Sequence, residues 1–394
     1  MSSEALTYSI IGASPVQLWG VANDERLHRL MRRAGLQDTG PQDSGASGPN
    51  RPVLLLRADH VYEEGVIRAL IAHPGYLLRT EQGKPVAAHL LAGGDLKAAE
   101  EILQQEACPT PAGLPHGLTA VDDPVGLATT YNHALRKRAT PYVLRLTAEA
   151  APAIEERMFR GAYKGVTDFV TKYVWPVPAL AVTRWCARHR ITPNKVTCLS
   201  FVFTLVAMWL FWIGQFVPGL VFAWAMCFLD TVDGKLARVT LTSSKFGNAF
   251  DHGIDLIHPP FWYYAWYVGQ GSSITGGAAE MEQSIALWII LAGYVLGRAQ
   301  EGLFIWLHQI EMHTWRPVDS WFRLITARRN PNLVILSVAA LAGRPATGFI
   351  AVAVWTVISF AFHCWRIGQA EGQRSGGRRL HSWLSEPVSE TARP

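Results

Sequence analysis

The chain has 394 residues, a formal net charge of +5 at pH 7 and 49% hydrophobic residues. This length allows two domains. The positive charge alone would permit nucleic-acid binding, but the Lys and Arg residues gather beside apolar segments, where membrane topology and anionic lipid explain them better. The five cysteines are scattered without a Cys-x2-Cys pair, so we expect neither a zinc site nor a disulfide framework.

Residues 1–150 have the composition of a soluble domain. Apolar runs such as residues 53–56 and 142–146 alternate with helical patterns such as residues 63–72, which predicts a small α/β domain. The first residues lack the basic and apolar regions of a cleaved signal peptide. We therefore expect this domain to stay in the cytoplasm.

Residues 151–195 mix aromatic and aliphatic residues with Arg and Lys. This pattern is typical of an amphipathic helix lying in the headgroup layer, although a helical linker packed on the soluble domain remains an alternative. Pro176 and Pro178 should divide the segment in two. Thr192 and Pro193 suit the cap and first turn of the following helix.

Residues 196–370 contain six candidate transmembrane helices, of which the fifth is short. They are residues 196–217, 219–238, 246–268, 284–307, 331–343 and 347–365. Lys and Arg concentrate on alternate connections, whereas residues 267–283 contain none and Arg344 is the outer exception. The positive-inside rule then predicts a multi-pass protein with both termini, including the tail 371–394, in the cytoplasm. We expect it in the cell inner membrane.

Two of these segments carry four aspartates. Asp230 and Asp233 are three residues apart, and Asp251 and Asp255 are four apart, so each pair shares one helical face. A tight turn would bring the pairs together, and their mutual repulsion favours a bound cation. Oxygen ligands favour Mg²⁺, Mn²⁺ or Ca²⁺ over zinc, and Mg²⁺ is commonly completed by water and substrate phosphates. Ion pairing of the acids with Arg238 is the structural alternative.

The spacing of these residues has a known counterpart. The pattern Asp230-x2-Asp233-Gly234-x2-Ala237-Arg238-x8-Gly247-x3-Asp251-x3-Asp255 resembles the complete signature of the CDP-alcohol phosphotransferases. The resemblance covers about residues 155–370 and includes PN-x-VT at residues 193–197. It implies a six-helix membrane domain, a homodimer and a site open to the cytoplasm. The implied reaction moves a substituted phosphate from a CDP-alcohol donor to an alcohol acceptor and releases CMP.

The resemblance also implies roles for individual residues. Asp230, Asp233 and Asp251 would hold one or two Mg²⁺ ions, with Mn²⁺ as a possible substitute. Asp255 would either complete this metal site or act as the catalytic base, and we favour the base. The residues expected to contact the CDP-alcohol are Gly234, Ala237, Arg238, Gly247, Asn194 and Thr197.

Several alternatives for the substrates remain open. We favour CDP-diacylglycerol as donor with a soluble alcohol as acceptor, because basic residues are available for an anionic acceptor. The alternative is a CDP-choline or CDP-ethanolamine donor with a lipid alcohol as acceptor. The sequence DHGID resembles the form of the motif found in choline and ethanolamine phosphotransferases. Arg298 and Glu301 either pair with each other or bind the acceptor, and Arg328 and Arg329 either anchor a helix or bind the acceptor. A nonenzymatic transporter or lipid-binding membrane protein is the alternative from another class.

Two stretches of the first domain, residues 54–71 and 120–138, are similar to parts of sugar-phosphate nucleotidyltransferases. Asp59 is the candidate for that family's metal-binding acid. However, the glycine-rich nucleotide loop with its basic residue is missing, and the domain is short for the full fold. We therefore expect a degenerate nucleotidyltransferase-like domain with a structural or regulatory role.

Overall fold

The computed structural model describes residues 6–38, 51–107, 113–122, 131–271, 277–377 and 379–385, apart from the side chains of Lys245, Phe246, Asn248 and Asp251. The chain divides into two compact units. The first comprises Met1–His133, Arg138–Ala162 and Val239–Leu241, and the second comprises Ala134–Lys137, Tyr163–Arg238 and Thr242–Pro394. The expected domain limits at residues 150, 195 and 370 stay a prediction.

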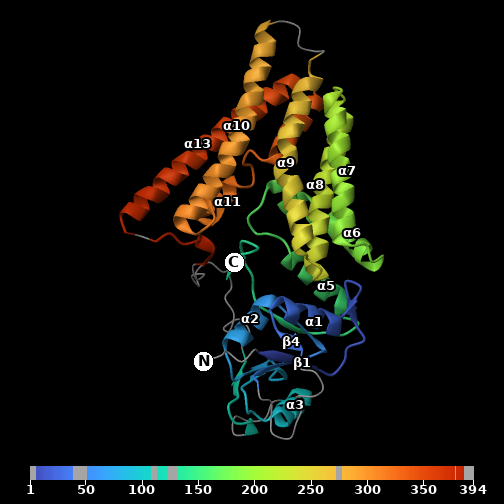
Figure 1. Cartoon of the computed structure of the whole chain (residues 1–394). Helices are drawn as coiled ribbons and strands as arrows, with labels where there is room; N and C mark the ends of the chain where they lie inside the picture. The colour runs from blue at the N-terminus through green and yellow to red at the C-terminus, as the bar shows by residue number, and fades with distance from the viewer. Residues whose placement is uncertain are drawn as a thin grey trace. The chain divides into compact units, whose positions relative to one another are not determined.

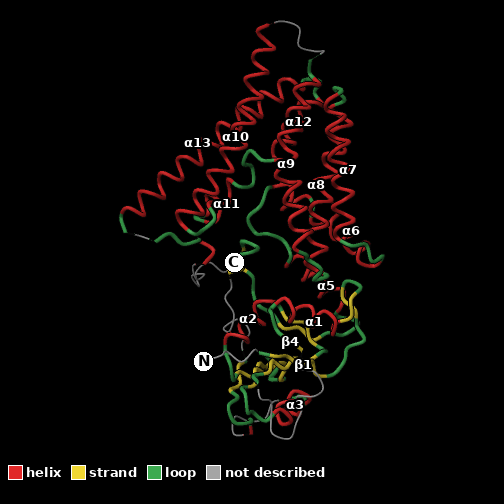
Figure 2. Tube along the Cα trace, in the orientation of Figure 1, coloured by secondary structure: helices red, strands yellow, loops and turns green. Residues whose placement is uncertain are grey.

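The strands of the first unit are drawn in yellow in Figure 2. Its main sheet is mixed and has the strand order β4-β1-β5-β8-β7-β9. These strands are β1 (Thr7–Ile11), β4 (Gln37–Asp38), β5 (Val53–Arg57), β7 (Tyr76–Arg79), β8 (Pro85–Leu90) and β9 (Thr119–Val121). β1 runs parallel to β4 and β5, β8 is antiparallel to β5 and β7, and β7 is parallel to β9. The short strands are β2 (Gln17–Leu18), β3 (Val21–Ala22), β6 (His60–Tyr62), β10 (Tyr131–Asn132), β11 (Lys137–Arg138) and β12 (Val143–Arg145).

Helices cover both faces of this sheet because its central strand is apolar on both faces (Figure 1). Leu54 and Leu56 point to one face, where they share a core with α1 (Asn23–Arg33) and α2 (Glu64–Ala72). Val53 and Leu55 point to the other face, toward α3 (Leu96–Gln104). This alternation follows from the two-residue period of a strand. The expected α/β character of the N-terminal region is confirmed, and α5 (Ala151–Gly161) follows it.

The second unit is helical (Figure 1). Its elements are η2 (Val170–Val174), α6 (Pro176–Arg188), α7 (Pro193–Trp212), α8 (Phe216–Val239), α9 (Lys245–Gly269), α10 (Gly277–His308), η3 (Met312–Thr314), α11 (Pro317–Phe322), α12 (Arg329–Leu341), α13 (Pro345–Ser375) and η4 (Trp383–Ser385). As expected, Pro176 begins a new helix, and Thr192 and Pro193 occupy the cap and first turn of α7.

Within the described residues, four helices are long and apolar enough to cross a membrane, namely α7, α8, α10 and α13. This confirms a membrane-like helical region. The count of six spans stays a prediction: α9 has 25 residues with Pro259 and Pro260 inside it, whereas α12 has only 13 residues. A straight helix of 13 residues is about 20 Å long, which is shorter than a hydrocarbon core of about 30 Å.

Aromatic and small side chains form the core of the second unit. Phe211, Trp262, Trp266 and Phe349 pack there with alanines of several helices. The ends of α7 and α9 approach so closely that a Cβ on Gly269 would lie 1.9 Å from the carbonyl oxygen of Phe211. Only glycine therefore fits at this point, and the close contact fixes α9, which carries half of the aspartates, against α7.

Candidate active site

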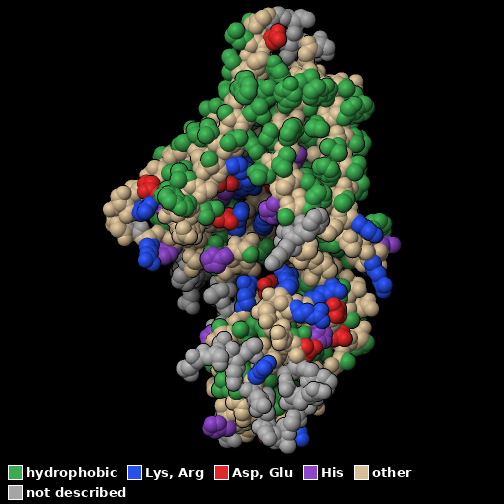
Figure 3. All heavy atoms as spheres, viewed as in Figure 1, with side chains coloured by type: hydrophobic (Ala, Val, Ile, Leu, Met, Phe, Trp, Pro, Cys, Tyr) green, Lys and Arg blue, Asp and Glu red, His purple; other side chains and the backbone are tan. Residues whose placement is uncertain are grey.

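A cavity of about 470 Å³ lies in the second unit. Figure 3 shows charged side chains in a hollow below the part of the surface where hydrophobic side chains gather. Among the described residues, eight basic and five acidic side chains line the cavity, so it carries a net positive charge. Because burying charges in a membrane protein is costly, such a lining indicates a binding site for an anionic ligand.

Helices α8 and α9 bring the expected aspartates together. Asp230 and Asp255 both line the cavity, as their helical spacing predicts. Asp233 is buried beside them, where its Oδ2 accepts a hydrogen bond of 2.6 Å from Thr197 Oγ1. The other oxygen, Asp233 Oδ1, is buried without a hydrogen-bond partner among the described residues. The side chain of Asp251 lies outside the described residues, although its backbone belongs to α9.

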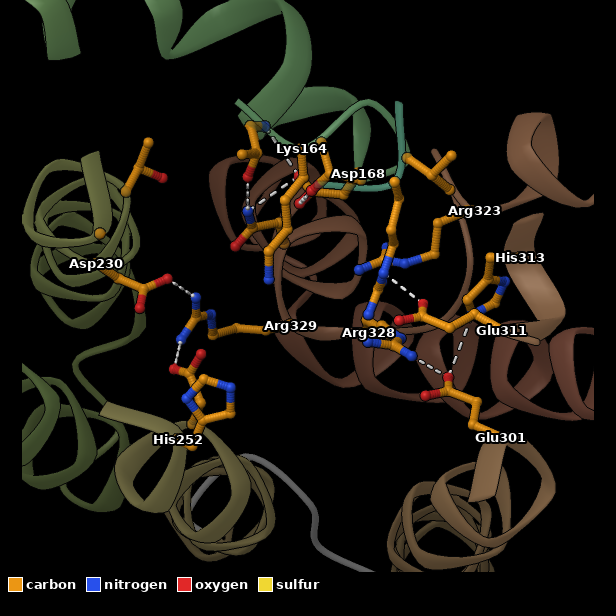
Figure 4. Close-up of a pocket in the computed structure, with 18 of the residues that line it drawn as sticks. Lys164, Asp168, Asp230, His252, Glu301, Glu311, His313, Arg323, Arg328 and Arg329 are labelled. Atoms are coloured by element: carbon orange, nitrogen blue, oxygen red, sulfur yellow. Dashed lines mark hydrogen bonds and ion pairs between the residues drawn. The ribbon is translucent and has the colours of Figure 1, made fainter. Parts of the chain in front are cut away.

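Arg329, the first residue of α12, contacts two of these carboxylates (Figure 4). Its Nη2 lies 2.5 Å from Asp230 Oδ2, and its Nη1 donates to Asp255 Oδ1. One guanidinium therefore bridges acids from two helices and offsets their repulsion. The sequence suggested Arg329 as an acceptor ligand, and these contacts were not foreseen. That acceptor role stays a prediction.

The aspartate cluster fits a hard divalent cation. All its donors are carboxylate oxygens, and an orphaned buried oxygen on Asp233 is a ligand position that the protein leaves unsatisfied. Arg329 forms ion pairs with both Asp230 and Asp255, so these carboxylates are already stabilised by a positive charge. No group of three or more His, Cys, Asp or Glu side chains with metal-binding geometry occurs in the part that is described, which does not include the Asp251 side chain.

Three of the residues expected to contact the CDP-alcohol, Thr197, Gly234 and Arg238, lie at the aspartates or at the same cavity. Gly234 and Arg238 line the cavity, and a Cβ on Gly234 would be 3.3 Å from Arg238 Nη2, so glycine leaves room for the guanidinium. Gly247 packs against Asn194, whose Oδ1 would lie 2.8 Å from a Cβ there. Ala237 is half-buried on α8. Their contacts with a nucleotide stay predictions.

A second group of charges lies on the opposite side of the cavity (Figure 4). Glu301 of α10 accepts from Arg328, lies 3.3 Å from His313 Nε2 and lies 3.7 Å from Arg298. The pairing of Arg298 with Glu301, one of the two alternatives for these residues, is therefore present, and their acceptor role stays a prediction. Burial lowers the pKa of His313 to about 3, so the ring is neutral at physiological pH.

The sequence did not point to Lys164 and Arg323, which also line this side. Lys164 follows α5 in the segment expected at the interface, and Arg323 looked like one of the cytoplasmic basic residues. No periodicity distinguishes a basic residue that faces a cavity from one that faces lipid headgroups, so packing alone reveals them.

Residues 190–365 match a family model described as CDP-alcohol phosphatidyltransferase. This part of the chain belongs to the CDP-alcohol phosphatidyltransferase family. The match contains the complete aspartate pattern and both helices that carry it.

Two proteins with related names are similar in sequence to part of this chain. The archaetidylinositol phosphate synthase of Pyrococcus horikoshii is 44% identical over 79 residues, which cover 20% of this chain and 42% of that protein. Ethanolaminephosphotransferase 1 of Pongo abelii is 38% identical over 72 residues, which cover 17% of each protein. The chain thus spans less than half the length of these relatives. A crystal structure of Mycobacterium tuberculosis phosphatidylinositol phosphate synthase with CDP-DAG bound is 18% identical, with a TM-score of 0.37, over 48% of this chain and 92% of that chain.

In the first unit, Asp59 is held by protein donors on both oxygens. Arg57 Nε and Nη2 lie 2.9 and 2.8 Å from the two carboxylate oxygens, and His60 Nδ1 lies 2.7 Å from Oδ1. Although burial raises the pKa of Asp59, these hydrogen bonds from His60 and Arg57 hold it well below its usual range. The carboxylate therefore forms an ion pair with Arg57, and the degenerate character of this domain stays a prediction.

Proposed function

We propose that the protein transfers a substituted phosphate from a CDP-alcohol, favoured to be CDP-diacylglycerol, to an alcohol acceptor and releases CMP in phospholipid synthesis. The convergence of Asp230 and Asp255 at one charged cavity, with Asp233 buried three residues from Asp230 on the same helix, carries this proposal. A cavity inside a helical membrane unit suits a reaction that joins a polar nucleotide to a lipid, since neither substrate fits entirely in lipid or in water.

In the proposed reaction, the acceptor hydroxyl oxygen attacks the phosphorus that carries the donor alcohol. The bond between this phosphorus and the bridging oxygen breaks, and CMP leaves with that oxygen. Asp255, which lines the cavity and is 40% exposed, takes the hydroxyl proton. Arg238, on the same helix as Asp230, would bind phosphate.

We propose Mg²⁺ as the cation, held by Asp230, Asp233 and Asp251, with Asp255 able to complete the site. When bound, it would neutralise charge on the pyrophosphate and on the leaving CMP. The unsatisfied Asp233 Oδ1 supports this assignment.

We propose six spans, cytoplasmic termini, an inner-membrane location and a homodimer, on the basis of the Lys and Arg distribution and the family resemblance. For the first unit we propose a structural or regulatory role, because Asp59 is engaged by Arg57 and His60. The anionic acceptor is supported by the positive lining, with Arg298, Glu301, Arg328 and Arg329 as candidate ligands.

A CDP-ethanolamine or CDP-choline donor with a lipid alcohol is the second candidate. It is favoured by the 38% identity to an ethanolaminephosphotransferase over 72 residues and by His252 in the motif.

The test is CMP release by the purified protein with Mg²⁺, using each donor with soluble and with lipid acceptors. Release that requires CDP-diacylglycerol and a soluble alcohol would support the first candidate. Release that requires a CDP-headgroup and diacylglycerol would support the second, and no release from any pair by the folded protein would favour a nonenzymatic role.

A further inference from the structure

Residues 379–385, which follow α13, pack against η3 and the residue after it; we call them the docked segment. Leu384 of this segment is 6% exposed. Leu380 packs against a small core that contains Met312 and Trp315. The docked segment is therefore held on η3 by its own apolar side chains, in addition to the hydrogen bonds that these residues form.

Donors of the docked segment satisfy two consecutive backbone carbonyls at the end of η3. Ser382 Oγ donates a 2.8 Å hydrogen bond to the carbonyl oxygen of Thr314, and Trp383 N donates a 3.2 Å hydrogen bond to that of Trp315. Thr314 and Trp315 are 1% and 4% exposed, so a backbone carbonyl that lost its donor here would be costly. The docked segment thus completes the hydrogen bonding of η3.

A third contact reaches His313 through a side chain of α11. Trp383 Nε1 donates a 3.0 Å hydrogen bond to Ser320 Oγ, and Ser320 Oγ donates a 2.7 Å hydrogen bond to the carbonyl oxygen of His313. The hydroxyl accepts from one group and donates to the next, so each hydrogen bond strengthens the other. Neither Ser320 nor Trp383 is among the residues that line the cavity, whereas His313 lines it.

The ring of His313 contacts Glu301 at the cavity wall (Figure 4). Its Nε2 lies 3.3 Å from Glu301 Oε1, and the same carboxylate accepts from Arg328. Because a carboxylate only accepts hydrogen bonds and the His313 ring is neutral, the ring proton lies on Nε2 and is donated to Glu301. The orientation of Glu301 therefore depends on where the backbone of η3 holds His313.

We propose that Trp383 is a positioning residue: through Ser320 it holds the backbone of His313, so that the His313 ring orients Glu301 at the cavity wall. The proposal rests on the proposed function for the reaction that this wall serves. In Figure 4, Glu301 and His313 lie on the side opposite Asp230. Misplacing Glu301 should therefore weaken binding of the alcohol acceptor and leave binding of the CDP-alcohol at the aspartates unchanged.

Hydrogen exchange followed by mass spectrometry tests the positioning without turnover. In the detergent-solubilised whole chain, Trp383→Phe and Ser320→Ala should each speed amide exchange in the peptide that contains η3 by about 5-fold, as expected for the loss of one hydrogen bond. Ser320→Thr keeps the hydroxyl and should exchange as the wild-type protein does. Trp321→Phe, at a tryptophan of α11 that is 69% exposed, is the matched control and should leave the exchange of η3 unchanged.

Kinetics of CMP release then separate positioning from a merely structural role. Trp383→Phe and Ser320→Ala should each raise the KM of the alcohol acceptor by about 3- to 10-fold while the KM of the CDP-alcohol donor stays unchanged. Ser320→Thr should restore the KM of the acceptor. A merely structural role would instead reduce the amount of active protein, and with it the apparent kcat, without changing either KM.

Three results would overturn the proposal: unchanged exchange of η3 in both Trp383→Phe and Ser320→Ala, an equal effect of Trp321→Phe, or a fall in kcat with both KM values unchanged. If no pair of substrates releases CMP, the proposed function fails, whereas the exchange of η3 still decides whether Trp383 and Ser320 hold His313 in place.

Discussion

Arg329 contacts two motif aspartates, so we predict that this arginine and a divalent cation compete for the same carboxylates. Arg329 and Asp230 have side chains that are 16% and 20% exposed, whereas Asp255 is 40% exposed. Removing one partner of a buried ion pair costs about 3–5 kcal/mol, and solvent at Asp255 reduces this to about 2 kcal/mol. Arg329→Gln should therefore destabilise the chelator-treated protein by about 2 kcal/mol.

The same substitution should strengthen metal binding. A cation that binds these carboxylates must displace Arg329. Removing Arg329 should therefore make the binding free energy of the cation more favourable by up to about 2 kcal/mol, which is roughly 30-fold in affinity. The assay is a Mn²⁺ titration of the chelator-treated protein followed by electron paramagnetic resonance, with thermal unfolding measured in parallel. Arg344→Gln, an exposed arginine before α13, should change neither quantity. Weaker Mn²⁺ binding in Arg329→Gln would refute the reasoning.

Two further predictions concern carboxylates that accept hydrogen bonds from neighbouring side chains. Thr197→Val removes the 2.6 Å hydrogen bond to Asp233 and should lower the unfolding free energy by about 1.5–3 kcal/mol. The control Thr204→Val loses only a 3.1 Å hydrogen bond within its own helix and should lower it less. Equal losses in the two variants would contradict the assigned role of Thr197. Asp59 has a lowered pKa, so its stabilising contribution is present above about pH 4 and is lost as the pH falls further. Asp59→Asn should remove this pH dependence from unfolding curves and leave CMP release unchanged, and a loss of CMP release in this variant would contradict a structural role for Asp59.

The sequence predicted which aspartates lie together because their spacing along each helix is local information. Residues three or four apart share a helical face wherever the helix lies, so the joint placement of Asp230 and Asp255 at one cavity needed only two helices joined by a short connection. The apolar run at residues 53–56, which alternates with helical patterns, predicted an α/β domain for a similar reason.

Contacts between distant segments could not be predicted in this way. Arg329 lies 99 residues from Asp230 and 74 from Asp255, and its contacts depend on how α12 packs beside α8 and α9. Within the described residues, Nε and Nη1 of Arg323 have no hydrogen-bond partner, and the sequence cannot show this because it depends on what Asp168 and Glu301 already bind. Spacing identifies residues that can meet, whereas packing determines which charges remain unsatisfied.

The central claim is that the aspartate cavity carries out phosphate transfer from a CDP-alcohol. The most direct test is CMP release from CDP-diacylglycerol by the purified wild-type protein and by Asp255→Asn, with Mg²⁺ and a phosphorylated alcohol as acceptor. We predict release by the wild-type protein and a loss of about 100-fold or more in the variant, in line with the contribution of a general base. Equal release by the two folded proteins would contradict the account.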